Sequence, residues 1–349
     1  MGSVNQLAVR GPRVREDDGA FVTLSGQHME YREVTAHKTL GLGIDAGGTR
    51  TRWALADAGG AIVAEGEVAG LSALQMTSAA GREGVRASFA LLAAAVLEHA
   101  RPGRVRAGIT GFGGDGEPLQ RSLGELLGLS AQCVTLCSDI EIAYFDCFTA
   151  GEGYLVYAGT GSIGAWIDAH RQFHRAGGRG VLLDDGGGGF WIAREALRLI
   201  WRNEDERPGC WRDSPMAHAV FAQVGGDDWS CSRQFMYGQE RGAVGRLALA
   251  VAASAELDPA AAAILHHAGA ELARLANALT ARFGPRPVVL TGRAGALHPI
   301  IAGAMRAALA PGTILTERVG QAHHAAARMA IDDALSAISR LTNLEEKNP

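Results

Sequence analysis

The chain has 349 residues, of which 47% are hydrophobic and 20% are charged, and its formal net charge is −4. This length allows two domains with separate cores, and the slightly acidic balance excludes a broad basic surface of the kind that binds nucleic acid. No apolar run in the sequence is long enough to predict a membrane span. From the charge and the apolar runs together, neither nucleic acid nor a membrane is expected as a partner.

Residues 1–40 are expected to form a disordered or hairpin extension, and they lack the apolar segment of a signal peptide. The chain has five cysteines, an odd number, and no Cys-x-x-Cys pair. This pattern favours a reduced, cytoplasmic protein over a disulfide scaffold.

From residue 41 the chain alternates between short apolar strands and helical patterns, which predicts an α/β domain over residues 41–150. The predicted strands are 41–46, 51–57, 61–67, 105–110 and 133–137, and the predicted helices are 80–100, 117–128 and 139–149.

Residues 151–349 are predicted to form a second α/β domain. Its expected strands are 153–158, 163–168, 171–174, 286–292 and 313–317, and its expected helices are 189–203, 215–224, 240–256, 259–283, 295–310 and 321–340. The last helix, 321–340, either stays with this domain or joins the first one. Small residues over 148–153 predict the hinge between the domains.

Both predicted domains open with a similar strand–turn–strand unit. Gly48 and Gly161, Thr49 and Ser162, and Trp53 and Trp166 are each 113 positions apart (161 minus 48, for instance). Chance could produce this in a chain with 47 glycines, but three pairs at one offset favour a duplicated α/β unit.

The two glycine-rich turns carry the materials of a phosphate cradle, namely free backbone N–H groups and hydroxyls. Either turn alone would more often be only a hairpin, but two turns facing one cleft could hold a nucleoside triphosphate. Asp45, at the end of the first strand, could hold Mg²⁺ through its water shell. Neither a P-loop nor a Gly-x-Gly-x-x-Gly turn before a helix is present.

Five stretches together resemble the acetate and sugar kinase/heat-shock-70/actin superfamily, in its N-acetylglucosamine kinase and glucosamine kinase branch, which is grouped with the BadF/BadG-type ATPases. They are "GIDAGGTRT", "LCSDIEIAYF", "YAGTGSIGAW", "AGGRGVLLDDGGGGFWIAREAL" and "VVLTGRAGAL". The resemblance implies two ribonuclease H-like, actin-like ATPase domains, with mixed sheets flanked by helices and the nucleotide in the cleft between them.

The resemblance also implies how the site residues are used. ATP with Mg²⁺ would be the cofactor, with Asp45 as the metal residue. The nucleotide would be held by Asp45, Gly47, Gly48, Thr49, Arg50, Gly159, Thr160, Gly161, Ser162, Gly292 and Gly295. Arg50 is expected to touch phosphate, whereas Arg52 is expected to face solvent. Asp139 would be the general base, although an aspartate at a helix start is also a common N-cap.

Ser72, Gln75, Asp139, Gly177, Gly178 and Asp185 are the expected sugar-binding residues. Asp184 is expected to be structural. Ser72-Ala73 stands where relatives carry a Ser-Asn pair, and Ile163 stands where acetylglucosamine kinases carry an asparagine. The choice between glucosamine and N-acetylglucosamine therefore stays open.

The resulting hypothesis is an ATP-dependent kinase that phosphorylates the 6-hydroxyl of an amino sugar. The alternatives are an ATPase that activates a partner enzyme, which needs cysteines beside the phosphate turns, and a non-catalytic sugar sensor. A homodimer is left open. The adjacent pair His323-His324 is expected at the surface or the rim of the cleft, in preference to a metal site.

Overall fold

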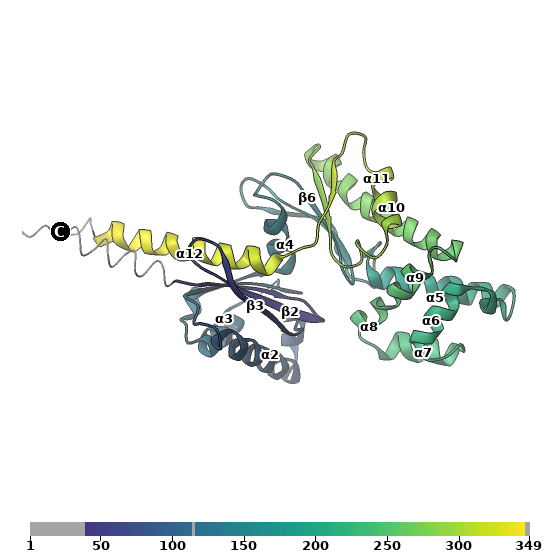
Figure 1. Cartoon of the computed structure of the whole chain (residues 1–349), viewed down its shortest axis with the longest axis horizontal. Coiled ribbons are helices and arrows are strands. Elements are labelled where there is room, and N and C mark those ends of the chain that lie inside the picture. The colour runs from purple at the N-terminus through teal and green to yellow at the C-terminus, as the bar shows by residue number, and fades with distance from the viewer. Residues whose placement is uncertain (1–38, 114–115, 346–349) are drawn as a thin grey trace, which may run out of the picture. The chain divides into compact units, whose positions relative to one another are not determined.

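The computed structural model describes residues 39–113 and 116–345, and the side chains of these residues up to 335 (Figure 1). The extension predicted over residues 1–40 lies almost wholly outside this part. The described residues form two mixed sheets of five strands each, flanked by helices.

The first sheet has the strand order β3-β2-β1-β4-β5. Strand β1 pairs antiparallel with β2 and parallel with β4; β2 also pairs antiparallel with β3, and β4 parallel with β5. The strands are β1 (Gly41–Ala46), β2 (Arg50–Ala56), β3 (Ile62–Ala69), β4 (Arg104–Ile109) and β5 (Val134–Ser138). The carboxyl ends of the parallel strands β1, β4 and β5 therefore meet at one edge.

The second sheet, in the order β10-β9-β6-β7-β8, repeats this plan. Strand β6 pairs antiparallel with β7 and parallel with β9, as β1 does with β2 and β4. The strands are β6 (Tyr154–Ala158), β7 (Ser162–Ile167), β8 (Phe173–Gly177), β9 (Val288–Thr291) and β10 (Leu315–Glu317). Equal order and pairing in both sheets are what a duplicated unit predicts, and the α/β fold with two mixed sheets is confirmed.

Helices follow the strands in both halves. The α-helices are α2 (Ala79–Leu97), α3 (Glu117–Leu127), α4 (Asp139–Cys147), α5 (Gly189–Glu206), α6 (Pro215–Val224), α7 (Trp229–Gly238), α8 (Arg241–Gly245), α9 (Leu247–Ser254), α10 (Pro259–Phe283), α11 (Pro299–Ala308) and α12 (Ala322–Glu345). Short 3₁₀ turns are η1 (Ala73–Thr77), η2 (Ala131–Cys133) and η3 (Cys210–Asp213). The first sheet and its helices are called the first lobe below, and the second sheet with α5 to α11 the second lobe.

Each lobe has its own apolar core. The first includes Ile44, Phe89 and Val105, and the second includes Leu155, Ile192 and Leu272. Helix α4 joins the second core through its buried face, although the prediction placed it within residues 41–150. That predicted boundary falls between α4 and β6 and stays a prediction.

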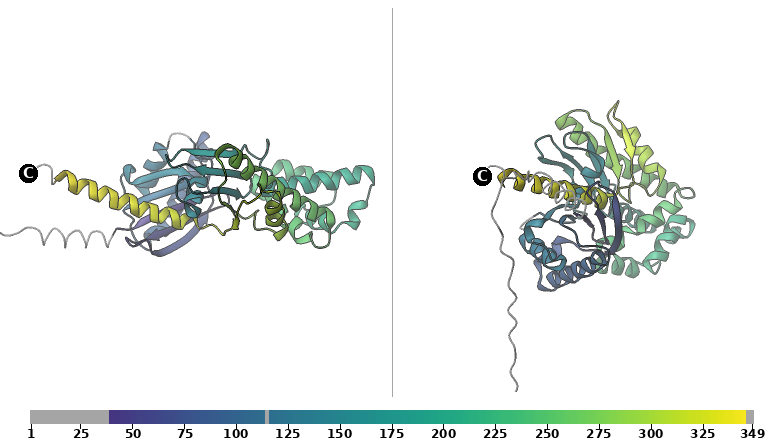
Figure 2. Two further views of the ribbon diagram at one scale, coloured as in Figure 1. Left: turned by 90° about the horizontal axis from the view of Figure 1, so that it is seen from above. Right: turned by 60° about the vertical axis from the view of Figure 1, so that its left-hand side comes forward.

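Helix α12 returns from the second lobe to pack on β1, β2 and β4 of the first sheet (Figures 1 and 2). A Cβ atom at Gly41 would lie 2.5 Å from the carbonyl oxygen of Ala327, and one at Gly43 would collide with that of His323. The small residues of β1 therefore let the helix backbone lie directly on the sheet. Ala54 and Ile331 fill the space beside this contact.

The predicted elements differ from the observed ones mainly in the helical part of the second lobe. The helix predicted over 240–256 is interrupted at Arg246, which separates α8 from α9. Helix α7 was not predicted, and the strand predicted at 171–174 lies at Phe173–Gly177 because Asp168 to Gln172 form a tight turn. Ser232 is the buried residue in α7, so an apolar stripe could not reveal it.

Within the described part, no single helix has the length and apolar character that crossing a membrane needs; only the bent pair Arg241–Ser254 and Pro259–Phe283 passes that test, by length and composition alone.

Candidate active site

The first glycine-rich turn joins β1 to β2 and is open. The Gly47 N–H donates to the Arg50 carbonyl over 3.0 Å and closes the turn. Gly48 and Thr49 are exposed, and a Cβ added at Gly48 would have no atom within 4 Å. This turn therefore presents its backbone and the Thr49 hydroxyl with no protein group in front of Gly48.

The second turn joins β6 to β7 and is packed against the start of α5. The N–H groups of Gly189 and Phe190 donate to the carbonyls of Gly159 and Thr160 over 2.8 and 2.9 Å. The Ser162 hydroxyl donates to the Gly186 carbonyl over 2.7 Å and is thus already engaged within the protein.

Helix α8 relates the two turns to each other. A Cβ atom at Gly242 would lie 3.2 Å from Oγ1 of Thr49 in the first turn. One at Gly245, a single helical turn further, would lie 3.5 Å from Cγ2 of Thr160 in the second. Both turns thus contact the same five-residue helix. The local sequence signal of this contact is the pair of glycines three residues apart, Gly242 and Gly245.

The expected adenosine loop lies directly behind the second turn. Gly292 has φ +97°, and a side chain there would collide with the Ala158 carbonyl at the end of β6. That carbonyl also accepts a 2.8 Å hydrogen bond from the Ala294 N–H. The loop after β9, with Gly292 and Gly295, is therefore anchored one residue before Gly159.

Asp139 opens α4 and is not its N-cap. Ser138 has that role, because its hydroxyl accepts from the Glu141 N–H over 3.2 Å. The capping alternative for Asp139 is therefore wrong. Its Oδ2 accepts a short hydrogen bond from the Thr110 hydroxyl, and its Oδ1 accepts from the Ile140 N–H. Burial raises the pKa of Asp139, the Thr110 hydrogen bond lowers it, and the nearby charge of Asp45 raises it further.

Asp139 and Asp45 face one small cavity of about 20 Å³, which has room for a water molecule. Its wall combines both lobes: the ends of β1, β6 and β9 contribute to it, together with β2, α4 and the start of α12. The lining residues are Asp45, Arg52, Asp139, Ile140, Ala143, Asp146, Tyr157, Thr291, Gly320 and Ala322. Burial, followed by the charges of Asp45 and Asp139, raises the pKa of Tyr157 to about 12, so its hydroxyl stays protonated.

The two arginines after the first turn have different surroundings, and the expectation for Arg52 is wrong. Arg52 does not face solvent, because its Nη2 lies 2.6 Å from Oδ2 of Asp45 and its Nη1 donates to the Gly320 carbonyl. Arg50 is exposed and pairs with Glu67 of β3 at 2.9 Å. In an antiparallel hairpin alternate residues share a face, and the register Asp45↔Arg52 places the second arginine beside the carboxylate.

The expected sugar residues Ser72 and Gln75 form a capping box at η1. The Gln75 Oε1 accepts from the Ser72 N–H over 3.0 Å, and the Ser72 hydroxyl donates to the Thr110 carbonyl. Thr110 therefore links Ser72 to Asp139, because its carbonyl accepts from Ser72 and its hydroxyl donates to Asp139. The amide oxygen of Gln75, in contrast, is already occupied by its bond with the Ser72 N–H. Thr110 belongs to none of the sequence motifs, and its place directly after strand β4, before Gly111, is the only local signal of its role.

Asp185 and the preceding glycines lie behind the second turn. Asp185 is 8% exposed with φ +57°, and its Oδ1 accepts from the Gly180 N–H over 3.1 Å. Burial raises the pKa of this carboxyl group, and Arg241 of α8 lowers it. Gly177 and Gly178 both have left-handed backbones, φ +66° and +64°, at the end of β8. Asp184 instead pairs with Arg274 at 3.0 Å, in agreement with a structural role.

These features define an α/β protein of the kinase-like ATPase class, with a two-lobed fold and two carboxylates at a cavity lined by both lobes. The sequence pattern of the BadF/BadG/BcrA/BcrD ATPase family matches residues 42–309, and the chain belongs to that family. No curated protein matches the chain.

Several solved structures share the fold. A candidate N-acetylglucosamine kinase from Chromobacterium violaceum is 26% identical, with a TM-score of 0.62, over 83% of this chain and 98% of that one. Another from Porphyromonas gingivalis is 16% identical, with a TM-score of 0.66, over 84% and 99%. A ROK family glucokinase from Streptomyces griseus, in complex with glucose and AMPPNP, is 17% identical, with a TM-score of 0.53, over 84% and 98%.

Proposed function

We propose that this protein is an ATP-dependent sugar kinase that transfers the terminal phosphoryl group of ATP to the 6-hydroxyl of an amino hexose, glucosamine or N-acetylglucosamine. The observation that carries the proposal is the buried Asp139 carboxylate beside Asp45, at the cavity where the two lobes meet. The family membership and the 26% identical relative support a phosphotransferase.

Asp139 is proposed as the general base. The sugar O6 forms a bond to the γ-phosphorus while the bond from phosphorus to the bridging oxygen breaks, ADP leaves, and the O6 proton passes to Asp139. Thr110 positions the carboxylate by donating to one of its oxygens. Burial raises the pKa of Asp139 and so makes it a better proton acceptor than a solvated aspartate, provided that the pH stays above that pKa.

The residues at the cavity suit Mg²⁺, the ion that kinase chemistry requires. Asp45 and Asp139 are close enough for the charge of one to raise the pKa of the other, so a cation between them relieves repulsion. Their ligand atoms are carboxylate oxygens, which Mg²⁺ prefers and contacts through its waters. When bound, Mg²⁺ neutralises phosphate charge; Asp45 would hold it and would then have to exchange its contact with Arg52.

The nucleotide is proposed to lie between the two turns. Gly47, Gly48, Thr49 and Arg50 would hold it from the first lobe, and Gly159, Thr160, Gly161 and Ser162 from the second. Gly292 and Gly295 would lie against the adenosine. The common neighbour α8 supports this arrangement, because Thr49 and Thr160 lie beside Gly242 and Gly245, which are one helical turn apart.

Lobe movement is proposed to open and close the cavity, since about 20 Å³ cannot hold a hexose. The expected hinge, residues 148–153, joins α4 to β6. A second connection between the lobes, called the crossover here, is the segment 318–321 between β10 and α12. Asp146 links the crossover to α4, because its Oδ2 accepts from the Gln321 N–H over 2.8 Å. Closure on both substrates would exclude water, so that phosphate passes to the sugar.

The sugar itself would be bound by Ser72, Asp185 and the backbone at Gly177 and Gly178, with Gln75 shaping the turn that carries Ser72. Ser72 is suited to this because its contact partner Thr110 is also the partner of Asp139. A sugar hydroxyl bound there would lie next to the base.

The deciding experiment is an assay of ADP release over a panel of hexoses and amino sugars. The full chain should phosphorylate glucosamine or N-acetylglucosamine, and Asp139→Asn should lower kcat by about 10² to 10⁴-fold while thermal stability is kept or raised, since a buried charge is removed. A fully active Asp139→Asn enzyme would disprove the role of this residue, and ADP release independent of every sugar would disprove the substrate class.

The same assay addresses the alternatives. An ATPase that activates a partner through a cluster needs cysteines at the phosphate turns, and the described residues around the cavity include none. A sensor without catalysis would bind the sugar and release no ADP.

A further inference from the structure

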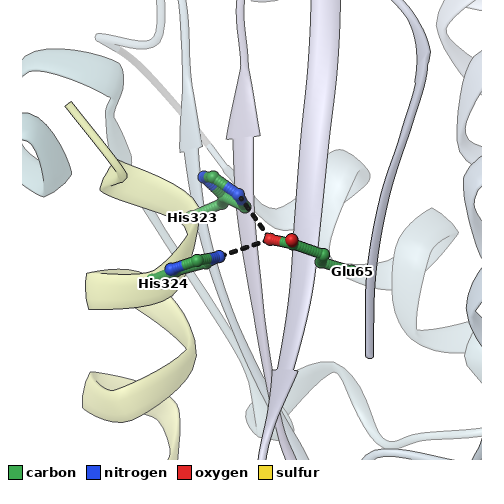
Figure 3. Close-up of side chains that lie close together, drawn as sticks. All are labelled: Glu65, His323 and His324. Atoms are coloured by element: carbon green, nitrogen blue, oxygen red, sulfur yellow. Dashed lines mark hydrogen bonds and ion pairs between the residues drawn. The ribbon is translucent and has the colours of Figure 1, made fainter. Parts of the chain in front are cut away.

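We propose that Glu65, His323 and His324 bind a divalent transition-metal ion of the zinc class, at the junction of β3 and the first turn of α12. Figure 3 shows both imidazoles pointing toward the Glu65 carboxylate. This site is separate from the proposed Mg²⁺ position at Asp45, and it does not depend on the proposed kinase activity.

The three ligand atoms already converge. The Nε2 of His324 lies 2.5 Å from Oε2 of Glu65, and the Nε2 of His323 lies 3.5 Å from the same oxygen. One ligand atom from each residue falls within 4.8 Å of the others. Around a tetrahedral zinc ion with bonds of about 2.0–2.1 Å, ligand atoms stand roughly 3.4 Å apart. The Glu65–His323 distance fits this value, and the Glu65–His324 contact needs to lengthen by about 1 Å.

His323 lacks a full hydrogen bond in the described structure. It is 7% exposed, its Nδ1 has no partner among the described residues, and its Nε2 has only the 3.5 Å contact with Glu65. A buried polar group without a partner is costly, so it calls for an explanation. An ion between the three side chains would bind the Nε2 lone pair in place of the long contact with Glu65, while Nδ1 would carry the ring proton.

The charge state of the cluster also suits a cation. Burial, with the positive charge of Arg52, lowers the pKa of His323 to about 4, so the ring is neutral at physiological pH. Its neighbour His324 lowers the pKa of Glu65, which is therefore ionised. Neutral imidazole and carboxylate are the forms that ligate metals.

The ligand set selects the class of ion. Two imidazole nitrogens with one carboxylate are typical of zinc and its neighbours in the transition series, whereas Mg²⁺ prefers oxygen ligands. Glu65 is the exposed member, with 56% of its side chain accessible, so water can complete the coordination from the solvent side.

The position of the cluster gives the ion a structural role. His323 lies over Gly43 of β1, because a Cβ atom at Gly43 would collide with the carbonyl oxygen of His323. Three residues earlier, the carbonyl of Gly320 accepts a hydrogen bond from Arg52. An ion at this point would fix the start of α12 to the outer strand β3. It would thereby hold the crossover from the second lobe beside the strand that carries Asp45.

The test uses the full chain after removal of metal with a chelator, without ATP or sugar. Titration with Zn²⁺ by calorimetry should show one ion per chain and a raised Tm, and Co²⁺ should give the visible absorption of a tetrahedral site. Glu65→Gln and His324→Ala should each weaken Zn²⁺ binding at least tenfold. Glu65 is exposed, so Glu65→Gln tests the site without threatening the fold.

Two control variants are matched to these. Glu67→Gln changes a glutamate on the same face of β3, and His266→Ala with His267→Ala removes the chain's other adjacent histidine pair, which is exposed on α10. Both should bind Zn²⁺ as the unaltered protein does. Absence of stoichiometric Zn²⁺ binding, binding unchanged by Glu65→Gln and His324→Ala, or binding lost in a control variant would each overturn the proposal.

Discussion

The two glycine-rich turns have the same place in two sheets of equal strand order but very different surroundings. The β1–β2 turn has open space around Gly48, whereas the β6–β7 turn lies against the start of α5. A Cβ at Gly188 would lie 2.6 Å from the carbonyl carbon of Gly161, and one at Gly161 would collide with the Asp185 carboxylate. Similar glycine-rich turns thus leave open space in the first lobe and pack closely against a helix start in the second.

This difference separates two reasons for a glycine. At Gly188 the neighbouring backbone of Gly161 leaves no room for a side chain, so replacing this glycine should lower the free energy of unfolding. At Gly48 nothing in the protein explains it, which is what a position reserved for a close ligand predicts.

The largest effect is expected at the packed turn. Gly188→Ala should lower the free energy of unfolding by about 1–3 kcal/mol, because backbone on both sides of the contact would have to move. Denaturant unfolding measures this directly. An unchanged midpoint would show that the second turn is looser than its contacts indicate.

Gly48→Ala should leave the free energy of unfolding unchanged and weaken ATP binding about tenfold, roughly 1.4 kcal/mol. The added methyl group meets no protein atom, so any loss of affinity must come from the nucleotide. Calorimetric titration with a nonhydrolysable ATP analogue, beside a thermal melt, tests both halves. Unaltered affinity would place the nucleotide away from this turn.

Asp185→Asn sharpens the comparison through pH. Burial raises the pKa of Asp185 in the folded protein, so its stability contribution is full below the unfolded pKa, near 3.8, and is lost as pH rises through the folded pKa. Asparagine keeps an acceptor for Gly180 and removes this loss. Stabilisation of the order of 1 kcal/mol is expected at pH 7 and none near pH 3, measured by denaturant unfolding at both. A difference independent of pH would contradict the assignment.

The smallest effect is expected for the ion pair beside the open turn. Glu67→Gln should change the free energy of unfolding by less than about 0.5 kcal/mol, because both Arg50 and Glu67 are largely exposed. Arg50→Ala should be equally mild for stability yet raise KM for ATP if this arginine reaches phosphate. Equal ATP kinetics in both variants would remove Arg50 from the proposed nucleotide site.

The sequence supports predictions best where the signal is local. Both turns, the strand ends and Asp139 could be placed because an apolar strand followed by glycine or a helix start shows within a few residues. The interrupted helix at Arg246 was missed because Gly242 and Gly245 break no apolar pattern, and their partners, Thr49 and Thr160, are far away in the chain.

The remaining errors in the site are also long-range. Arg52 was expected in solvent, since nothing nearby in sequence shows that Gly320 would come to accept its hydrogen bond. Thr110 became informative only when β4 and β5 were aligned, which brings its hydroxyl to Asp139. Gln75 could not be separated from a ligand-binding amide until its capping contact with Ser72 was seen.

The packing of α12 on Gly41 and Gly43 has a consequence for biosynthesis. The first sheet is translated early, but the helix that covers one of its faces begins only at Ala322. At about 5–20 residues per second, the ribosome needs on the order of tens of seconds to reach it. During that interval the nascent amino-terminal half carries an uncovered apolar surface, which makes it a natural client for chaperones until the last helix emerges.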